Sequence, residues 1–177
     1  MKNYLFVCFV LFANLLFAQK PITTSTGEIE FFSSTPVEDI KAVNKKVQSA
    51  LNTSNNEIAF KAPIKDFIFP KALMQEHFNE NYMETEKYPN ATFAGKINEK
   101  VDFSKDGTYL VTATGKLNIH NVSQDRTVNG SLIIKNGKVS LDAAFDVALA
   151  DHKIEIPTIV FKKIAEKIAI KVKLQYQ

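Results

Sequence analysis

Long runs in which apolar and polar side chains alternate constrain this chain of 177 residues more than any other feature. In residues 108–121, 138–150 and 167–177, an apolar or small side chain stands at almost every second position. Successive side chains of a β-strand point to opposite faces of the sheet, so this period predicts strands with one buried face and one face in water. Strands patterned in this way are typical of antiparallel sheets.

Shorter alternating segments predict further strands at residues 28–33, 57–69, 91–98 and 128–134. In the second of these, the apolar positions change phase between Ile64 and Phe67, next to Pro63, which predicts a bulge or bend. The total is roughly eight strands, which is typical of an antiparallel barrel or sandwich. Closing the sheet into a barrel would remove the exposed strand edges that promote aggregation.

Two inserts interrupt the strand pattern. Residues 70–83 are predicted to be helical, because five large side chains recur there at helical spacing. These side chains are Leu73, Met74, His77, Phe78 and Tyr82. A second, shorter helical insert is expected at residues 157–163.

Turn and capping residues predict local features between the strands. The tripeptides at 105–107 and 136–138, Lys-Asp-Gly and Asn-Gly-Lys, are predicted as tight hairpin turns. The segment 35–38, Thr-Pro-Val-Glu, has the pattern of a helix start, although the residues after it also resemble a strand. We therefore expect a short helical turn at 38–43, followed by a strand at 46–52.

The first 18 residues are predicted to be a secretory signal peptide. Lys2 precedes an apolar run from Leu5 to Phe17 that only Asn14 interrupts, and Ala18 precedes the expected cleavage site. The run is shorter than the about 20 residues that a membrane-spanning helix needs. We expect export to the periplasm or the outside of the cell, and a soluble mature protein that forms a single domain at residues 19–177.

Composition excludes several classes of function from that domain. Cys8, the single cysteine of the chain, lies in the predicted signal peptide, so disulfide bonds, thiol catalysis and cysteine-ligated metals are excluded. The formal net charge of +3 is spread along the chain without a basic cluster, which argues against nucleic-acid binding. The sequence leaves open whether the domain forms a homodimer.

Residues 74–93 gather the side chains that most resemble a chemical site. Glu76, His77 and Glu80 lie within about one helical turn, but a zinc site needs three or four converging ligands, and the spacing supplies one strong ligand. Two carboxylates four residues apart on a helix usually face water rather than act as an acid–base pair. We expect no metal, no cofactor and no catalytic residue here, and we interpret the segment as a lid. His120 and His152 are interpreted as rim or surface residues.

Three segments, of which the first includes residues 74–93, carry a resemblance to a known family. They are LMQEHFNENYMETEKYPNATFAGKI at 73–97, HNVSQDRTVNGSL at 120–132 and LADHKIEIPTI at 149–159. In sequence, order and placement they resemble the YceI-like family of exported lipid-binding proteins, over nearly all of the mature chain. The chain departs from the family pattern at Asn121, where Gly is frequent, and at His152, where Tyr is frequent.

The resemblance implies a lipocalin-like, eight-stranded antiparallel barrel that holds an isoprenoid or similar amphiphile. We expect nine side chains to line its lumen: Phe31, Phe60, Phe67, Phe93, Tyr109, Val111, Leu132, Phe145 and Ile170. At the rim we expect His77, Phe78, Asn81 and Tyr82, with His77 and Asn81 as candidates for headgroup contact. Small residues would leave room in mid-barrel, or would only let strands approach closely. These are Ala62, Gly95, Ala113, Gly115, Gly130 and Ala143.

The predicted function is non-catalytic binding of an isoprenoid or fatty-acid-like lipid, whose tail gains about 0.8 kcal/mol for each buried methylene. One alternative is a secreted interaction protein with a fully packed barrel and no ligand. Another is a lipid-modifying enzyme that would use Glu76 or His77.

Overall fold

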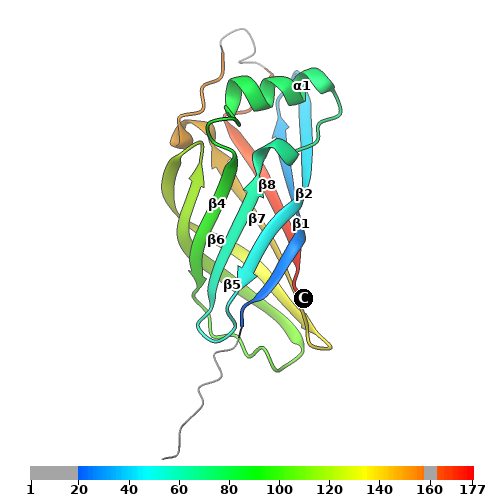
Figure 1. Cartoon of the computed structure of the whole chain (residues 1–177), viewed down its shortest axis with the longest axis vertical. Helices are drawn as coiled ribbons and strands as arrows, with labels where there is room; N and C mark the ends of the chain where they lie inside the picture. The colour runs from blue at the N-terminus through cyan, green and yellow to red at the C-terminus, as the bar shows by residue number, and fades with distance from the viewer. Residues whose placement is uncertain (1–19, 158–162) are drawn as a thin grey trace, which may run out of the picture.

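The computed structural model describes residues 20–157 and 163–177. Eight strands form a closed antiparallel barrel, in which each strand pairs with the next and β8 returns to β1 (Figure 1). The strands are β1 (Ile22–Ser34), β2 (Asp39–Leu51), β3 (Glu57–Pro63), β4 (Asn90–Ile97), β5 (Gly107–Ile119), β6 (Val122–Lys135), β7 (Lys138–Ala148) and β8 (Lys167–Gln175). The predicted all-β, eight-stranded barrel is confirmed. The predicted signal peptide and most of the insert expected at 157–163 lie outside the described residues.

Alternation decides which side chains fill the barrel. On β5, Val111 and Leu117 are buried, whereas Leu110 between the inward positions is 82% exposed. The three long alternating segments of the sequence are confirmed as β5, β7 and β8. Because a barrel wall has only one dry face, the two-residue period places one apolar set inside.

One end of the barrel carries the helical segment that the sequence predicts at 70–83. It consists of α1 (Ala72–His77) and a π-helical turn, η2 (Phe78–Tyr82), which lie across the barrel end (Figure 1). The phase change beside Pro63 is a short 3₁₀ turn, η1 (Ile64–Asp66), which turns Phe67 and Phe69 back into the interior. A further 3₁₀ turn, η3 (Leu149–His152), follows β7 at the same end. We call α1 and η2 together the lid.

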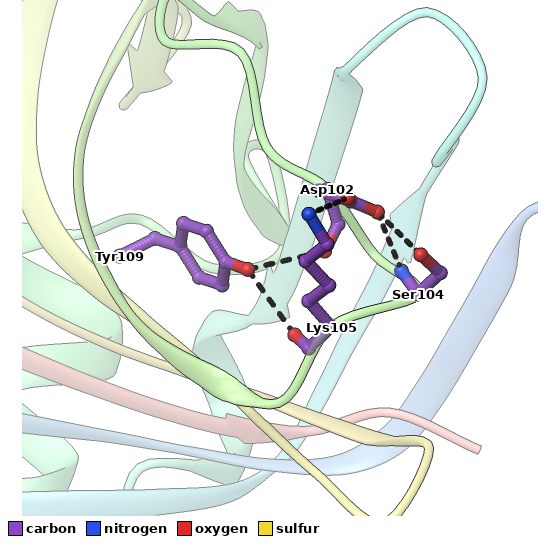
Figure 2. A network of polar contacts seen from close by, with 4 residues as sticks. All are labelled: Asp102, Ser104, Lys105 and Tyr109. Carbon is purple, nitrogen blue, oxygen red and sulfur yellow. Dashed lines mark hydrogen bonds and ion pairs between the residues drawn. The ribbon is translucent and has the colours of Figure 1, made fainter.

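The opposite end is closed by packed side chains. Five fully buried apolar residues meet there: Val47, Leu51, Ile97, Leu132 and Leu174. The loop 98–106 folds against the same end, where the hydroxyl of Tyr109 donates to the carbonyl oxygens of Asp102 and Lys105 at 3.2 and 3.1 Å (Figure 2). Asp102 in turn accepts hydrogen bonds from the backbone amide and hydroxyl of Ser104 (Figure 2).

Two local predictions are wrong. The helical turn expected at 38–43 is the start of β2, because the Thr35 hydroxyl accepts from the amides of Val37 and Glu38 and closes a turn between β1 and β2 rather than capping a helix. The tight turn expected at 105–107 is the end of the longer loop 98–106. The turn at Asn136 and Gly137 is confirmed, with φ values of 51° and 72°.

Candidate ligand-binding site

An apolar cavity of about 450 Å³ lies beneath the lid. A deeper chamber of about 90 Å³ adjoins it, since five residues line both: Ile29, Ala62, Ala91, Leu117 and Phe145. The packed residues at the far end of the barrel close the chamber below. Volumes of this order are typical of sites for small apolar ligands. Within the part of the chain that the structure describes, the barrel therefore contains two adjoining apolar chambers, of which the upper lies beneath the lid.

Small side chains create this space. Ala62 and Ala91 are the small residues among the five that line both chambers, at a level that we call the passage, and Ala113, Gly130 and Ala143 line the deeper chamber. The sequence selects four of these as lumen positions. Larger side chains at the same level would fill the barrel, because an eight-stranded barrel is only just wide enough to hold a ligand.

Seven of the nine predicted lumen residues line the cavity. Phe31, Phe67 and Ile170 line the upper chamber, Phe60, Phe93 and Val111 line the deeper one, and Phe145 lines both. Tyr109 and Leu132 lie instead in the core at the closed end, where Leu132 is fully buried and Tyr109 reaches the 98–106 loop. Alternation gives the side on which a residue lies but not its height along the barrel axis.

Phe78 anchors the lid over the cavity. Its ring centroid lies 4.9 Å from that of Phe69, 5.7 Å from Phe67 and 5.9 Å from Phe31. Clusters of this kind contribute more than their buried area alone, because the ring edges and faces attract one another. The Phe78 side chain is thus held by one ring of β1 and by two rings of the segment between η1 and α1.

Of the other three predicted rim residues, two line the cavity and one does not. His77 and Tyr82 line the cavity with Phe78, whereas Asn81 is exposed and does not line it. Burial raises the pKa of Tyr82, so its hydroxyl stays protonated at neutral pH. Leu73, on α1, also lines the cavity and is 60% exposed.

Charged side chains of the cavity lining gather at the mouth. The Lys71 ammonium lies 3.0 Å from the Glu38 carboxylate, so α1 is tied to the turn between β1 and β2. Lys163 lines the same mouth and is exposed. The cavity therefore has an apolar interior and a polar opening. An amphiphile, with an apolar tail and a polar end, matches this arrangement.

Of the two histidines interpreted as rim or surface residues, His152 is buried and His120 is partly buried. His152 is fully buried, so its interpretation as a rim or surface residue is wrong; its Nδ1 donates to the Val122 carbonyl at 3.0 Å. Burial lowers the pKa of His152, which keeps the ring neutral. The His120 side chain is 13% exposed and contacts Glu84 and Tyr88. His120 and Asn121 form the tight turn between β5 and β6, and both take positive φ. In the sequence, this turn is indicated by the position of the two residues between two alternating segments.

The carboxylates considered for metal binding or catalysis lie away from the cavity. Glu76 and Glu80 are exposed on the lid. Within residues 20–157 and 163–177, no three His, Cys, Asp or Glu side chains converge as a metal site requires. In the same residues, no helix has the length and apolar character to span a membrane.

Comparisons with known proteins agree with this architecture. No curated protein matches the chain. A polyisoprenoid-binding domain from Saccharophagus degradans implicated in plant cell wall breakdown superposes with a TM-score of 0.76 at 14% identity, covering 89% of this chain and 97% of that one. BcnA of Burkholderia cenocepacia superposes at 0.72 and 14% identity, covering 85% and 96%. The Campylobacter jejuni YceI protein gives 0.57 at 18%, covering 100% and 99%. The YceI-like domain profile matches residues 18–176, so the chain belongs to the YceI-like family.

Proposed function

We propose that this protein is an exported, non-catalytic lipid-binding protein that holds the tail of an isoprenoid or similar amphiphile in the barrel. The observation that carries the proposal is the pair of adjoining apolar chambers beneath the lid, about 450 Å³ above and about 90 Å³ below. Each methylene buried in such a space gains about 0.8 kcal/mol before ordering costs are subtracted.

The orientation of the ligand follows from the polarity of the cavity. A tail enters toward Phe60 and Phe93, where the lining is almost wholly apolar. The polar end stays at the mouth, within reach of Lys71, His77 and Lys163. Asn81, the other headgroup candidate, would have to turn inward to contribute.

Two observations favour this function over the alternatives. An interaction protein with a fully packed barrel does not need a cavity, and alanine at positions 62 and 91 keeps the passage open. A lipid-modifying enzyme would use Glu76 or His77; Glu76 is exposed and does not line the cavity, which leaves His77 at the mouth as the one group of the two beside the ligand.

Mass spectrometry of organic extracts from the purified protein tests the proposal directly. An amphiphile that co-purifies in stoichiometric amount is expected. The fluorescent probe N-phenyl-1-naphthylamine supplies a second test, because its emission rises when it enters an apolar site. An absence of both co-purified lipid and probe binding would contradict the proposal.

A matched pair of variants locates the binding. Ala62→Leu adds side-chain atoms at the passage, where they reduce the volume of both chambers, and should weaken probe binding at least tenfold. Ala59→Leu adds the same atoms to the outer face of the same strand, where Ala59 is exposed, and should leave binding unchanged. Equal effects of the two substitutions would place the probe elsewhere.

A further inference from the structure

Three chain segments at the lid end are joined by one histidine. His120 lies in the turn between β5 and β6; its Nε2 is 3.1 Å from the Glu84 carboxylate, directly after the lid, and its Nδ1 is 3.3 Å from the His152 carbonyl in η3. The Tyr88 ring packs edge-on against the imidazole, with centroids 4.6 Å apart. We call the contacts of His120 with Glu84 and with the His152 carbonyl the His120 bridge.

Two simultaneous hydrogen bonds in the bridge would require a doubly protonated imidazole. Both partners of His120 are acceptors, since a carbonyl oxygen and an ionised carboxylate carry no proton. A neutral imidazole has one N–H and can satisfy one of them, whereas an imidazolium donates to both. Glu84 is held as a carboxylate, because hydrogen bonds from Lys87 and then from His120 lower its pKa.

Each joined segment also supplies a neighbouring residue to the cavity wall. Met83 precedes Glu84, Ile119 precedes His120, and Ile154 follows His152 by two positions; all three line the upper chamber. The backbone at Glu84 and His120 takes φ values of 43° and 51°, which non-glycine residues adopt only where the surroundings hold them. A change at the bridge therefore acts directly on the end of the lid.

Few other charges face the imidazole. On the side of the lid it meets Glu84, which also pairs with Lys87, and the neutral Tyr88 ring. On the side of η3 it meets the His152 carbonyl; the His152 ring itself is buried, and burial lowers its pKa. Farther along η3, Asp151 pairs with Arg126.

We propose that the His120 bridge is a pH-sensitive latch that holds the lid closed when His120 is protonated and loosens it when His120 loses a proton. The inference rests on the proposed function, since the lid covers the site assigned there to a lipid tail. Imidazoles ordinarily change charge between about pH 5 and 8, which sets the range over which the latch is tested. Ligand is retained at lower pH and exchanges faster at higher pH.

Stopped-flow displacement of N-phenyl-1-naphthylamine measures the exchange. The dissociation rate should rise about tenfold between about pH 5.5 and about 8.5, the size expected when one charge-assisted hydrogen bond is lost. His120→Asn, which tolerates the left-handed turn, should give a fast rate at every pH. Glu84→Gln removes the carboxylate without changing the side-chain shape and should flatten the same pH dependence.

Asp125→Asn is the control for the hairpin. It breaks the exposed ion pair between Asp125 and Lys116 on the same two strands, 2.9 Å long, and should leave the pH dependence intact. A pH step that persists in His120→Asn and disappears in His77→Asn would assign the response to the exposed lid histidine and overturn the proposal. A rate independent of pH in the unmodified protein would overturn it as well.

A measurement without ligand separates the latch from the lipid-binding function. The chain has three histidines, so ¹H–¹⁵N spectra of His-labelled protein can assign each ring with single variants. His120 should carry protons on both nitrogens at low pH. The amides of Met83 and Thr85, which bond to Phe78 and Asn79 in the lid, should lose hydrogen-exchange protection as His120 deprotonates, after correction for intrinsic exchange. If the hydrogen-exchange protection of these amides does not change with pH, the latch is contradicted. If only probe binding fails, the proposed lipid-binding function is contradicted and the latch is not.

Discussion

Gly95 on β4 and Gly115 on β5 are register partners whose backbones are in close contact. A Cβ built on Gly115 would lie 2.5 Å from the Gly95 Cα and 2.3 Å from the Ala94 carbonyl oxygen. Neither glycine lines the cavity, so their smallness serves the approach of two strands. Gly130 and Ala143, also small, serve the cavity instead.

Gly115→Ala should therefore lower the free energy of unfolding by about 1–3 kcal/mol, the usual cost of forcing atoms into a packed site. The added methyl meets backbone atoms, which cannot turn aside as a side chain would. Gly130→Ala is the comparison, since its nearest contact would be 3.0 Å and its methyl would enter the deeper chamber. Chemical denaturation of both variants measures the difference, and equal losses would contradict this account.

A substitution at Gly137 measures the cost of a left-handed backbone conformation without a change in packing. Its φ is +72° in the turn between β6 and β7, and a Cβ there would have no atom within 4 Å. Gly137→Ala should cost about 1 kcal/mol through left-handed strain alone. Gly137→Asn should recover much of that loss, because asparagine adopts this conformation more readily. Urea unfolding compares the two, and an alanine variant as stable as the parent would rule out the strain.

Phe78→Ala should free the lid from the barrel. The substitution removes ring contacts with Phe31, Phe67 and Phe69 and should cost about 2–3 kcal/mol, at the low end for a large core side chain because Phe78 is partly exposed. Probe dissociation should also accelerate. Phe32→Ala, on the same β1 strand as Phe31 but at an outward position, should leave the dissociation rate as it is.

Because the hydroxyl of Tyr176 is buried, we expect the protein to lose stability when this group ionises at high pH. Its hydroxyl and the Ser49 hydroxyl are 2.9 Å apart and buried; Ser49 donates to the Ala59 carbonyl, so Tyr176 donates to Ser49. Burial raises the pKa of Tyr176 from 10.0 to about 12. The folded state thus binds this proton more tightly than the unfolded state, and the stabilisation is complete below pH 10 and lost as the pH rises to 12.

The shift of two pKa units corresponds to about 3 kcal/mol in full, of which about 2 kcal/mol is lost by pH 12, where the folded-state group is half ionised. Guanidinium unfolding at pH 9 and pH 12 should show it. Tyr176→Phe should be about 1 kcal/mol less stable than the parent at pH 9, because one hydrogen bond is lost. The variant should also lose less stability than the parent on going to pH 12. Parallel losses in both proteins would show that other groups are responsible.

Much of the fold follows from local pattern. The alternation on β5, β7 and β8 determines which side chains face inward, and the helical spacing from Leu73 to Tyr82 identifies the lid. The phase change beside Pro63 locates η1. These features are predictable because each depends on the geometry of neighbouring residues in one segment.

Errors arise where a local signal has two physical outcomes. Thr35 has the pattern of a helix cap, yet the same hydroxyl closes a turn when the next residues pair as a strand. His152 stands in a polar stretch, but its ring is buried because η3 folds onto the start of β6 and brings it to the Val122 carbonyl. Only pairing between distant segments decides these cases.

The sequence by itself determined the sidedness of β5, β7 and β8 and the presence of an apolar interior, because strand periodicity is a property of the backbone. The tertiary structure decided how much of that interior is empty. Height along the barrel depends on the register of all eight strands, which separates Ala113 in the cavity from Gly115, two residues away, at a strand contact. The same register brings Glu84, His120 and His152 together, although they are 36 and 32 residues apart in the chain.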